Sequence, residues 1–122
     1  MFRQYNDNKI IITRGDDARL TFFINTGTKL EPVRFDLRNN FNSKLTWYLM
    51  KPNTRYENAI LVKEYTSDDC NDDGDVIVKF DHKDTIDLPE GIYYYTVKLT
   101  YYDGETKQIN TIIPESLFLI ED

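Results

Sequence analysis

Apolar and polar residues alternate with a period of two along much of this 122-residue chain. Such alternation places every second side chain on one face of a β-strand, so that one face can be buried. Eight runs show the pattern clearly or weakly: Lys9–Thr13, Ala18–Ile24, Leu45–Met50, Ala59–Tyr65, Val76–Phe80, Tyr93–Tyr102, Glu105–Ile113 and Ser116–Ile120. We therefore expect a fold built from seven or eight short strands.

The composition favours the same fold class. Val, Ile, Thr, Tyr, Phe and Trp make up 46 of the 122 residues, whereas Ala occurs only twice. Side chains that are aromatic or branched at Cβ fit a pleated sheet better than a helix. The length suits one core and no linker is visible, so residues 1–122 are predicted to form a single all-β domain.

Turn signals separate the strand runs. Arg14-Gly15-Asp16 follows the first run, and Asp103-Gly104 suits a type I′ hairpin because both central residues of that turn need a positive φ. Pro114 is expected to split the last run, since proline cannot donate to a strand ladder. Asp84–Leu88 is predicted to form one helical turn. Short strands with frequent turns indicate an antiparallel sandwich or a small barrel.

One segment favours the sandwich. Leu88-Pro89-Glu90-Gly91-Ile92-Tyr93-Tyr94-Tyr95 resembles the entry into strand F of immunoglobulin-like domains. The resemblance implies that Tyr93 turns the corner and that Tyr95 takes the place of the usual second Cys. It also implies that Trp47 fills the core position on strand C, with Phe22 near the position of the other missing Cys.

The order of these pieces resembles small immunoglobulin-like virion proteins of tailed bacteriophages. The matching segments are Thr13-Arg14-Gly15-Asp16, the run Ala18–Ile24, the run Lys44–Lys51, Asp84-Thr85 with Gly91–Tyr95, the Asp103-Gly104 hairpin and the tail Thr111–Ile120. The resemblance implies a non-enzymatic structural protein assembled into virions in the bacterial cytoplasm. An accessory capsid protein that decorates the head is the first expectation, and a neck, tail or baseplate component the next.

Charge and composition exclude several function classes. The formal net charge of −6 argues against nucleic-acid or anionic-membrane binding, because both need a positive field. No apolar run is long enough to span a membrane, and the first residues lack the apolar core of a secretory signal. One Cys rules out an internal disulfide, and one His excludes sites that need two imidazoles. We expect no cofactor.

The segment Asp68–Asp75 is the only dense acidic cluster of the sequence, and hard cations such as Ca²⁺ need several oxygen ligands. Asp69, Asn71 and Asp73 have the spacing of the first ligands of a calcium loop. Counted from Asp69, Ile77 and Phe80 take positions 9 and 12 of such a loop, where a calcium ion needs further oxygen ligands that these two side chains cannot supply. A solvated hairpin loop is therefore the main interpretation, and a weak Ca²⁺ site is the alternative.

Two further patterns could suggest an activity. Cys70 and His82 are close in the sequence, but acidic neighbours disfavour a thiolate, so we predict no catalytic role for them. Arg14-Gly15-Asp16 matches an adhesion tripeptide, yet it reads more simply as a tight turn. The chain is predicted not to be an enzyme.

Several aromatic side chains fall on strand faces that should be polar. Phe23, Tyr48, Tyr94 and Tyr102, together with Met50, are expected to point away from the core. Grouped exposed aromatics indicate contact with another chain, either another virion protein or a second copy of this one. The alternative is that the Gly27–Ser43 loop or the terminal segments of the chain cover them. The competing hypothesis is a carbohydrate-binding module. Lys9–Thr13 and Ser116–Ile120 are the expected sheet edges, where a partner could add a strand.

Overall fold

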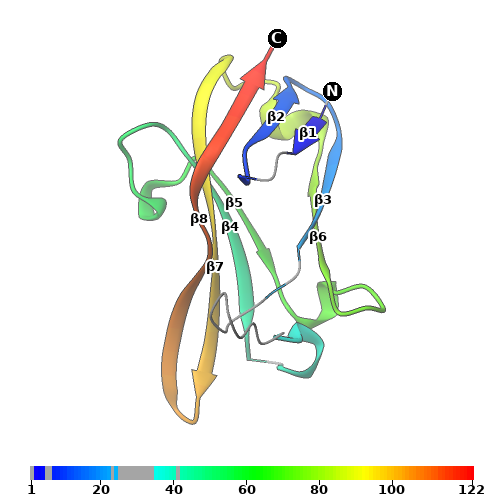
Figure 1. The fold of residues 1–122 in the computed structure, drawn as a ribbon, viewed down its shortest axis with the longest axis vertical. Helices are drawn as coiled ribbons and strands as arrows, with labels where there is room; N and C mark the ends of the chain where they lie inside the picture. Colours follow the sequence, from blue (N-terminus) through cyan, green and yellow to red (C-terminus); the bar gives the residue numbers. More distant parts are fainter. Residues whose placement is uncertain (1, 5–6, 23, 25–34, 41) are drawn as a thin grey trace.

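The computed structural model describes residues 2–4, 7–22, 24, 35–40 and 42–122. These residues are mostly β, as predicted (Figure 1). The strands are β1 (Phe2–Gln4), β2 (Ile10–Thr13), β3 (Ala18–Phe22), β4 (Lys44–Met50), β5 (Leu61–Tyr65), β6 (Val76–Phe80), β7 (Gly91–Asp103) and β8 (Thr106–Glu121). Short helical turns are η1 (Leu37–Asn39), η2 (Tyr56–Asn58), η3 (Ser67–Asp69) and α1 (His82–Thr85).

The strands form two sheets of unequal size. The larger has the order β1-β2-β8-β7-β4-β5, and the smaller pairs β3 with β6. β2 runs parallel to β8, whereas the other pairs are antiparallel, so the prediction of a purely antiparallel fold is wrong. A parallel neighbour needs a long crossover and leaves no local signal, and here β2 and β8 come from opposite ends of the chain.

The two sheets pack around Trp47, which is fully buried as predicted. Its ring centroid lies 4.9 Å from that of Phe80 in the smaller sheet, 5.8 Å from Tyr95 and 5.6 Å from Phe118. Each such aromatic pair stabilises the fold by about 0.5–1.5 kcal/mol beyond the burial of its area. Tyr95 is fully buried at its predicted core position, whereas the side chain of Phe22 lies outside the described residues.

The turn into β7 is held by Tyr93. Its hydroxyl donates a 2.7 Å hydrogen bond to the carbonyl oxygen of Pro89, four residues earlier, while its ring is buried. The predicted helical turn before this strand is α1, which begins two residues earlier than expected. Asp81 and Asp84 form a capping box there, and this fixes where the turn begins.

β8 continues through Pro114, so the expected break in the last run is wrong. Between the pairs Tyr95–Ser116 and Val97–Ile113, β7 advances by two residues while β8 moves by three. This bulge frees Pro114 from donating to the ladder. The hydroxyl of Thr96 donates to the carbonyl of Ile113 (2.7 Å), and that of Ser116 donates to the carbonyl of Pro114 (2.8 Å).

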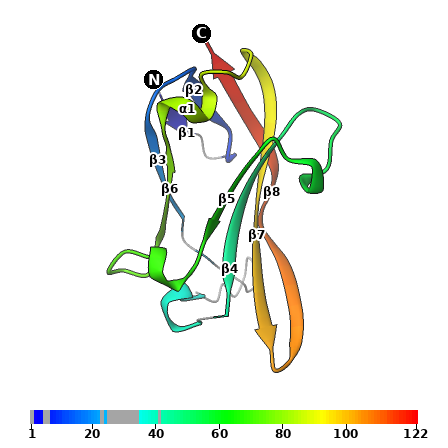
Figure 2. The ribbon, with the colours of Figure 1, turned by 180° about the vertical axis from the view of Figure 1, so that it is seen from behind.

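The hairpin between β7 and β8 extends beyond the other strands (Figures 1 and 2). We call residues Thr100–Ile109 the arm, because β4 begins only at Lys44, opposite Thr100. Gly104 has φ +65°, and Glu105 is not among the residues with positive φ. A single positive φ at the first central position defines a type II′ turn, so the predicted type I′ turn is wrong.

Both predicted sheet edges are also wrong. Ser116–Ile120 lies inside the larger sheet between β2 and β7, and Lys9–Thr13 lies between β1 and β8. Among the described residues, the larger sheet instead ends at β1 and β5, and β3 and β6 are both edges of the smaller sheet. Within the described ranges, no helix is long and apolar enough to cross a membrane.

Candidate functional site

The predicted contact residues lie on what we call the outer face, the side of the larger sheet that is turned away from β3 and β6. Tyr48, Tyr94 and Tyr102 alternate with core residues and so share this face. Phe23 lies outside the described residues. The three tyrosines differ in exposure: Tyr102 on the arm is 48% exposed, whereas Tyr48 and Tyr94 are half-buried.

Tyr48 is covered by the segment that follows its own strand. The ring of Tyr56 in η2 contacts it edge-on with centroids 5.1 Å apart, and Lys98 Nζ lies 4.6 Å from the Tyr56 ring centroid. Met50 also points to the outer face, yet it is fully buried, so its expected exposure is wrong. The segment carrying η2 stands out from this side of the sheet (Figures 1 and 2).

The exposed large hydrophobic side chains gather on this outer face. Register and alternation assign to it all five that the described residues contain: Ile60, Val62, Ile92, Tyr102 and Ile109. Ile92 is 55% exposed and borders a shallow groove of about 190 Å³ with Pro52 and Pro89. Sequence reasoning missed Ile92, although it lies two residues before Tyr94 and must share its face.

The residues around Ile109 in the sequence do not predict that its side chain lies on the outer face. Ile109 is 52% exposed and lies opposite Thr100 on the arm. Its place on the outer face depends on the register between β7 and β8, which the length of the loop between them sets. Any two-residue loop, of type I′ or type II′, places Ile109 opposite an outward-facing residue of β7, so the length of the loop decides which face Ile109 takes.

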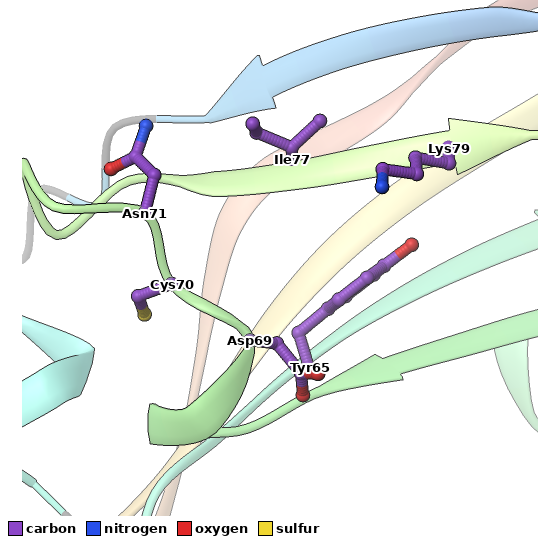
Figure 3. A pocket seen from close by; sticks show the side chains of 6 residues that line it. All are labelled: Tyr65, Asp69, Cys70, Asn71, Ile77 and Lys79. Carbon is purple, nitrogen blue, oxygen red and sulfur yellow. The ribbon is translucent and has the colours of Figure 1, made fainter.

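A second candidate region is the groove between the ends of β5 and β6 (Figure 3). It has a volume of about 350 Å³ and is lined by Tyr65, Asp69, Cys70, Asn71, Ile77 and Lys79. Burial raises the pKa of the Cys70 thiol, and the charge of Asp36 raises it further. A thiol with a raised pKa is a poor nucleophile at neutral pH.

His82 does not join Cys70. Cys70 bridges Val76 at the start of β6, whereas His82 follows the end of that strand. A strand rises about 3.3 Å per residue, so roughly 20 Å separates the two backbones. His82 instead contacts the first turn: its Nδ1 lies 2.8 Å from the carbonyl oxygen of Gly15.

The oxygens proposed for calcium hold the loop itself together. Asp69 accepts hydrogen bonds from the backbone N–H of Thr66 (2.7 Å) and from its hydroxyl (3.3 Å). The side-chain oxygen of Asn71 accepts from the N–H groups of Asp73 (3.0 Å) and Asp75 (2.9 Å). In the part of the chain that the structure describes, no three His, Cys, Asp or Glu side chains form a group that could hold a metal ion.

Arg14-Gly15-Asp16 forms a packed turn. Gly15 has φ +81°, its N–H donates to the hydroxyl of Thr85 (2.8 Å), and Arg14 forms an ion pair with Asp122. A Cβ at Gly15 would lie 2.9 Å from Ile86 Cδ1. The tripeptide is thus held against α1, which accounts for its residues without an adhesion role.

Comparison of the chain with family models, curated proteins and solved structures finds no match. A function must therefore be inferred from the residues of the chain itself. The outer face is the strongest candidate site, because the exposed large hydrophobic side chains of the described residues gather there.

Proposed function

We propose that the chain is an immunoglobulin-like sandwich that serves as a structural protein of a tailed-bacteriophage virion. The strand order supports the fold. β5, β4, β7 and β8 follow one another in the larger sheet as strands C′, C, F and G do, while β3 and β6 pair as B and E do. The buried Trp47 on β4 and the Tyr93–Pro89 hydrogen bond correspond to the core Trp and the tyrosine corner of such domains.

The observation that carries the functional proposal is the gathering of exposed hydrophobic side chains on the outer face. A decoration protein is held on a particle by contacts between surfaces rather than by a reaction. Ile92, Tyr94 and Tyr102 are the proposed anchors, since apolar and aromatic side chains dominate the energetics of protein interfaces. The proposal assigns no catalytic residue and no cofactor to the chain.

Within the virion we place the protein on the head as an accessory capsid component, with the neck, tail or baseplate as the other positions. Its net charge of −6 makes a protein surface a better partner than nucleic acid. The protein would be made in the cytoplasm of the host bacterium and assembled there onto particles.

The test is mass spectrometry of purified particles from the phage that encodes the chain. The proposal expects the protein in intact particles in many copies, and it expects Ile92→Lys with Tyr102→Ser to lower the copy number. As a matched control, Thr21→Ser on the smaller sheet should be incorporated like wild type. Recovery of the protein only in the soluble lysate would contradict the proposal. Glycan or cell-wall binding that Tyr102→Ser abolishes would favour the carbohydrate-binding alternative.

A further inference from the structure

β8 has an open side along the arm. β2 covers this side only from Phe118 to Glu121, while β7 covers the opposite side along the whole strand. Among the residues that the structure describes, no strand pairs with the open side from Thr106 to Thr111, which we call the free edge. Both ribbon views show this half of β8 at the margin of the molecule (Figures 1 and 2).

The free edge has only one of the features that normally protect an edge strand, the charged side chain of Lys107. Such strands are usually short, charged, interrupted by proline or covered. The edge strands β5 and β6 are protected in these ways. β5 carries the charged residues Lys63 and Glu64. At β6, the backbone of Lys79 forms a hydrogen bond with Tyr65, and Val76 forms a β-bridge with Cys70. Lys107 is the one charged residue of the free edge, and the stretch Gln108–Ile113 that follows it contains three Ile residues and no charge, proline or glycine.

The backbone of the free edge is directed outward at Ile109. The two-residue turn closes on the pair Asp103–Thr106, which is the hydrogen-bonded kind of pair in such a hairpin. Hydrogen-bonded and non-hydrogen-bonded pairs then alternate along the ladder. The N–H and C=O groups of Lys107, Ile109 and Thr111 therefore point away from β7, toward the free edge.

We propose that the free edge pairs with the free edge of a second copy of this chain, as antiparallel strands related by a two-fold axis at Ile109. Ile109 then faces Ile109 of the second copy, Gln108 faces Asn110, and Lys107 faces Thr111. The two Ile109 residues exchange both of their backbone hydrogen bonds, and their exposed side chains cover each other. The result is one sheet that continues across the dimer.

The sequence of the edge argues for a second copy as the occupant. A two-fold axis brings each residue near its own copy, so a charged edge would repel itself. With the axis at Ile109 no charged residue faces another, because Lys107 meets Thr111 and Glu105 meets Ile113. The contact is small, so we expect a weak dimer with a dissociation constant in the micromolar to millimolar range.

Side-chain hydrogen bonds between β7 and β8 hold the backbone of the free edge in place. Lys98 Nζ donates to the Thr111 hydroxyl (2.9 Å), and the Asn110 amide donates to the Tyr101 hydroxyl (3.2 Å). Tyr101 in turn contacts the ring of Phe35 with centroids 5.8 Å apart. These contacts hold the arm in strand geometry, which lowers the entropy cost of adding a strand.

The test measures the dissociation constant of the purified full chain by analytical ultracentrifugation. Ile109→Pro removes the outward N–H without touching the ladder to β7, and Ile109→Lys places like charges at the axis. Each should raise the dissociation constant at least about tenfold. Thr21→Lys, which adds the same charge at an exposed position of β3 in the smaller sheet, is the matched control and should keep the wild-type value.

Hydrogen exchange supplies an independent readout. The amides of Lys107, Ile109 and Thr111 should become protected as the concentration of the wild-type chain rises, whereas that of Gln108 should not change. Far-UV circular dichroism checks that each variant is folded. If Ile109→Pro does not fold, Ile109→Lys alone tests the proposal. A wild-type chain that stays monomeric at millimolar concentration overturns the proposal, as does a dimer that both variants leave unchanged. Neither result bears on virion incorporation, which is measured separately.

Discussion

Gly15 joins two segments that are far apart in the sequence. Its backbone N–H and C=O contact Thr85 and His82, so the first turn of the chain is fastened to the helical turn before β7. The positive φ and the absence of a Cβ are both needed there, because Ile86 and the His82 ring leave no space.

Gly15→Ala should lower the free energy of unfolding by about 2–4 kcal/mol, since the cost of left-handed backbone adds to the steric clash. The control is Gly104→Ala, where φ is also positive but no atom lies within 4 Å of the added Cβ. Its cost should be only the backbone contribution of about 1–2 kcal/mol. Urea unfolding measures both values, and equal losses would show that the packing at Gly15 is unimportant.

Tyr95 links the core to the segment before β2. It is fully buried, and its hydroxyl donates to the carbonyl oxygen of Asn8. Burial raises the pKa of Tyr95 far above its usual value, with a smaller contribution from the charge of Asp7. Burial raises the pKa of Tyr93 and of Tyr65 as well.

These raised pKa values predict alkaline destabilisation. The folded chain keeps the phenol protons when the unfolded chain has released them, so the free energy of unfolding should fall as pH rises above about 10. Tyr95→Phe should flatten this decline, and at neutral pH it should cost about 1–3 kcal/mol through the lost hydrogen bond. Urea unfolding at neutral and alkaline pH tests this, and an unchanged alkaline slope in Tyr95→Phe would refute the assignment.

At the scale of elements, β5 is tied to α1 by an ion pair. Lys63 Nζ lies 2.9 Å from Asp84 Oδ2, and the two side chains are only 18% and 10% exposed. Asp84 also accepts a hydrogen bond from the N–H of Asp81 (2.8 Å), and Lys63 lies 5.8 Å from the Phe80 ring centroid. The pair thus links an edge strand of the larger sheet to the helical turn that follows β6.

A double-mutant cycle with Lys63→Met and Asp84→Asn should give a coupling energy of about 1–3 kcal/mol, because water screens this pair little. The matched control is the exposed pair Lys44–Glu64, whose atoms lie 3.1 Å apart with side chains 41% and 55% exposed. Its coupling should not exceed about 1 kcal/mol and should fade in high salt. Equal coupling energies for the two pairs would mean that the burial of Lys63 and Asp84 does not strengthen their ion pair.

Over the whole molecule, the two sheets share one core. Trp47 belongs to the larger sheet and contacts Phe80 of the smaller one, and the buried cluster contains residues from β2, β3, β4, β6, β7 and β8. Neither sheet can keep its buried face away from water without the other, so the molecule should unfold cooperatively.

Trp47 is the only tryptophan, so its fluorescence reports on this shared core. Its emission should be that of a buried indole, and its unfolding midpoint in urea should coincide with that of far-UV circular dichroism. Trp47→Ala should cost about 3–5 kcal/mol and lower both midpoints together, which the circular dichroism curve can follow. Separate midpoints for the two probes in the wild-type chain would show that the sheets unfold independently.

Local pattern was enough to predict most of the strands and the centre of the core. Alternation around Trp47 and along Tyr93–Tyr102 depends only on neighbouring residues, and so does the tight turn at Gly15. These features arise from the period of a strand and from the φ that a turn requires, both of which are properties of short segments.

The surfaces that a partner could touch were decided by contacts between distant segments. The parallel pairing of β2 with β8 moved both expected edges into the sheet, and Tyr56 covered one of the predicted anchors. The bulge at Pro114 and the turn at Gly104 set which side chains of β8 face outward. The sequence alone thus determined most of the segments that become strands and the side chains at the centre of the core. Tertiary structure decided where the sheets end and what stays exposed, because register and edge position depend on pairings between residues far apart in the chain.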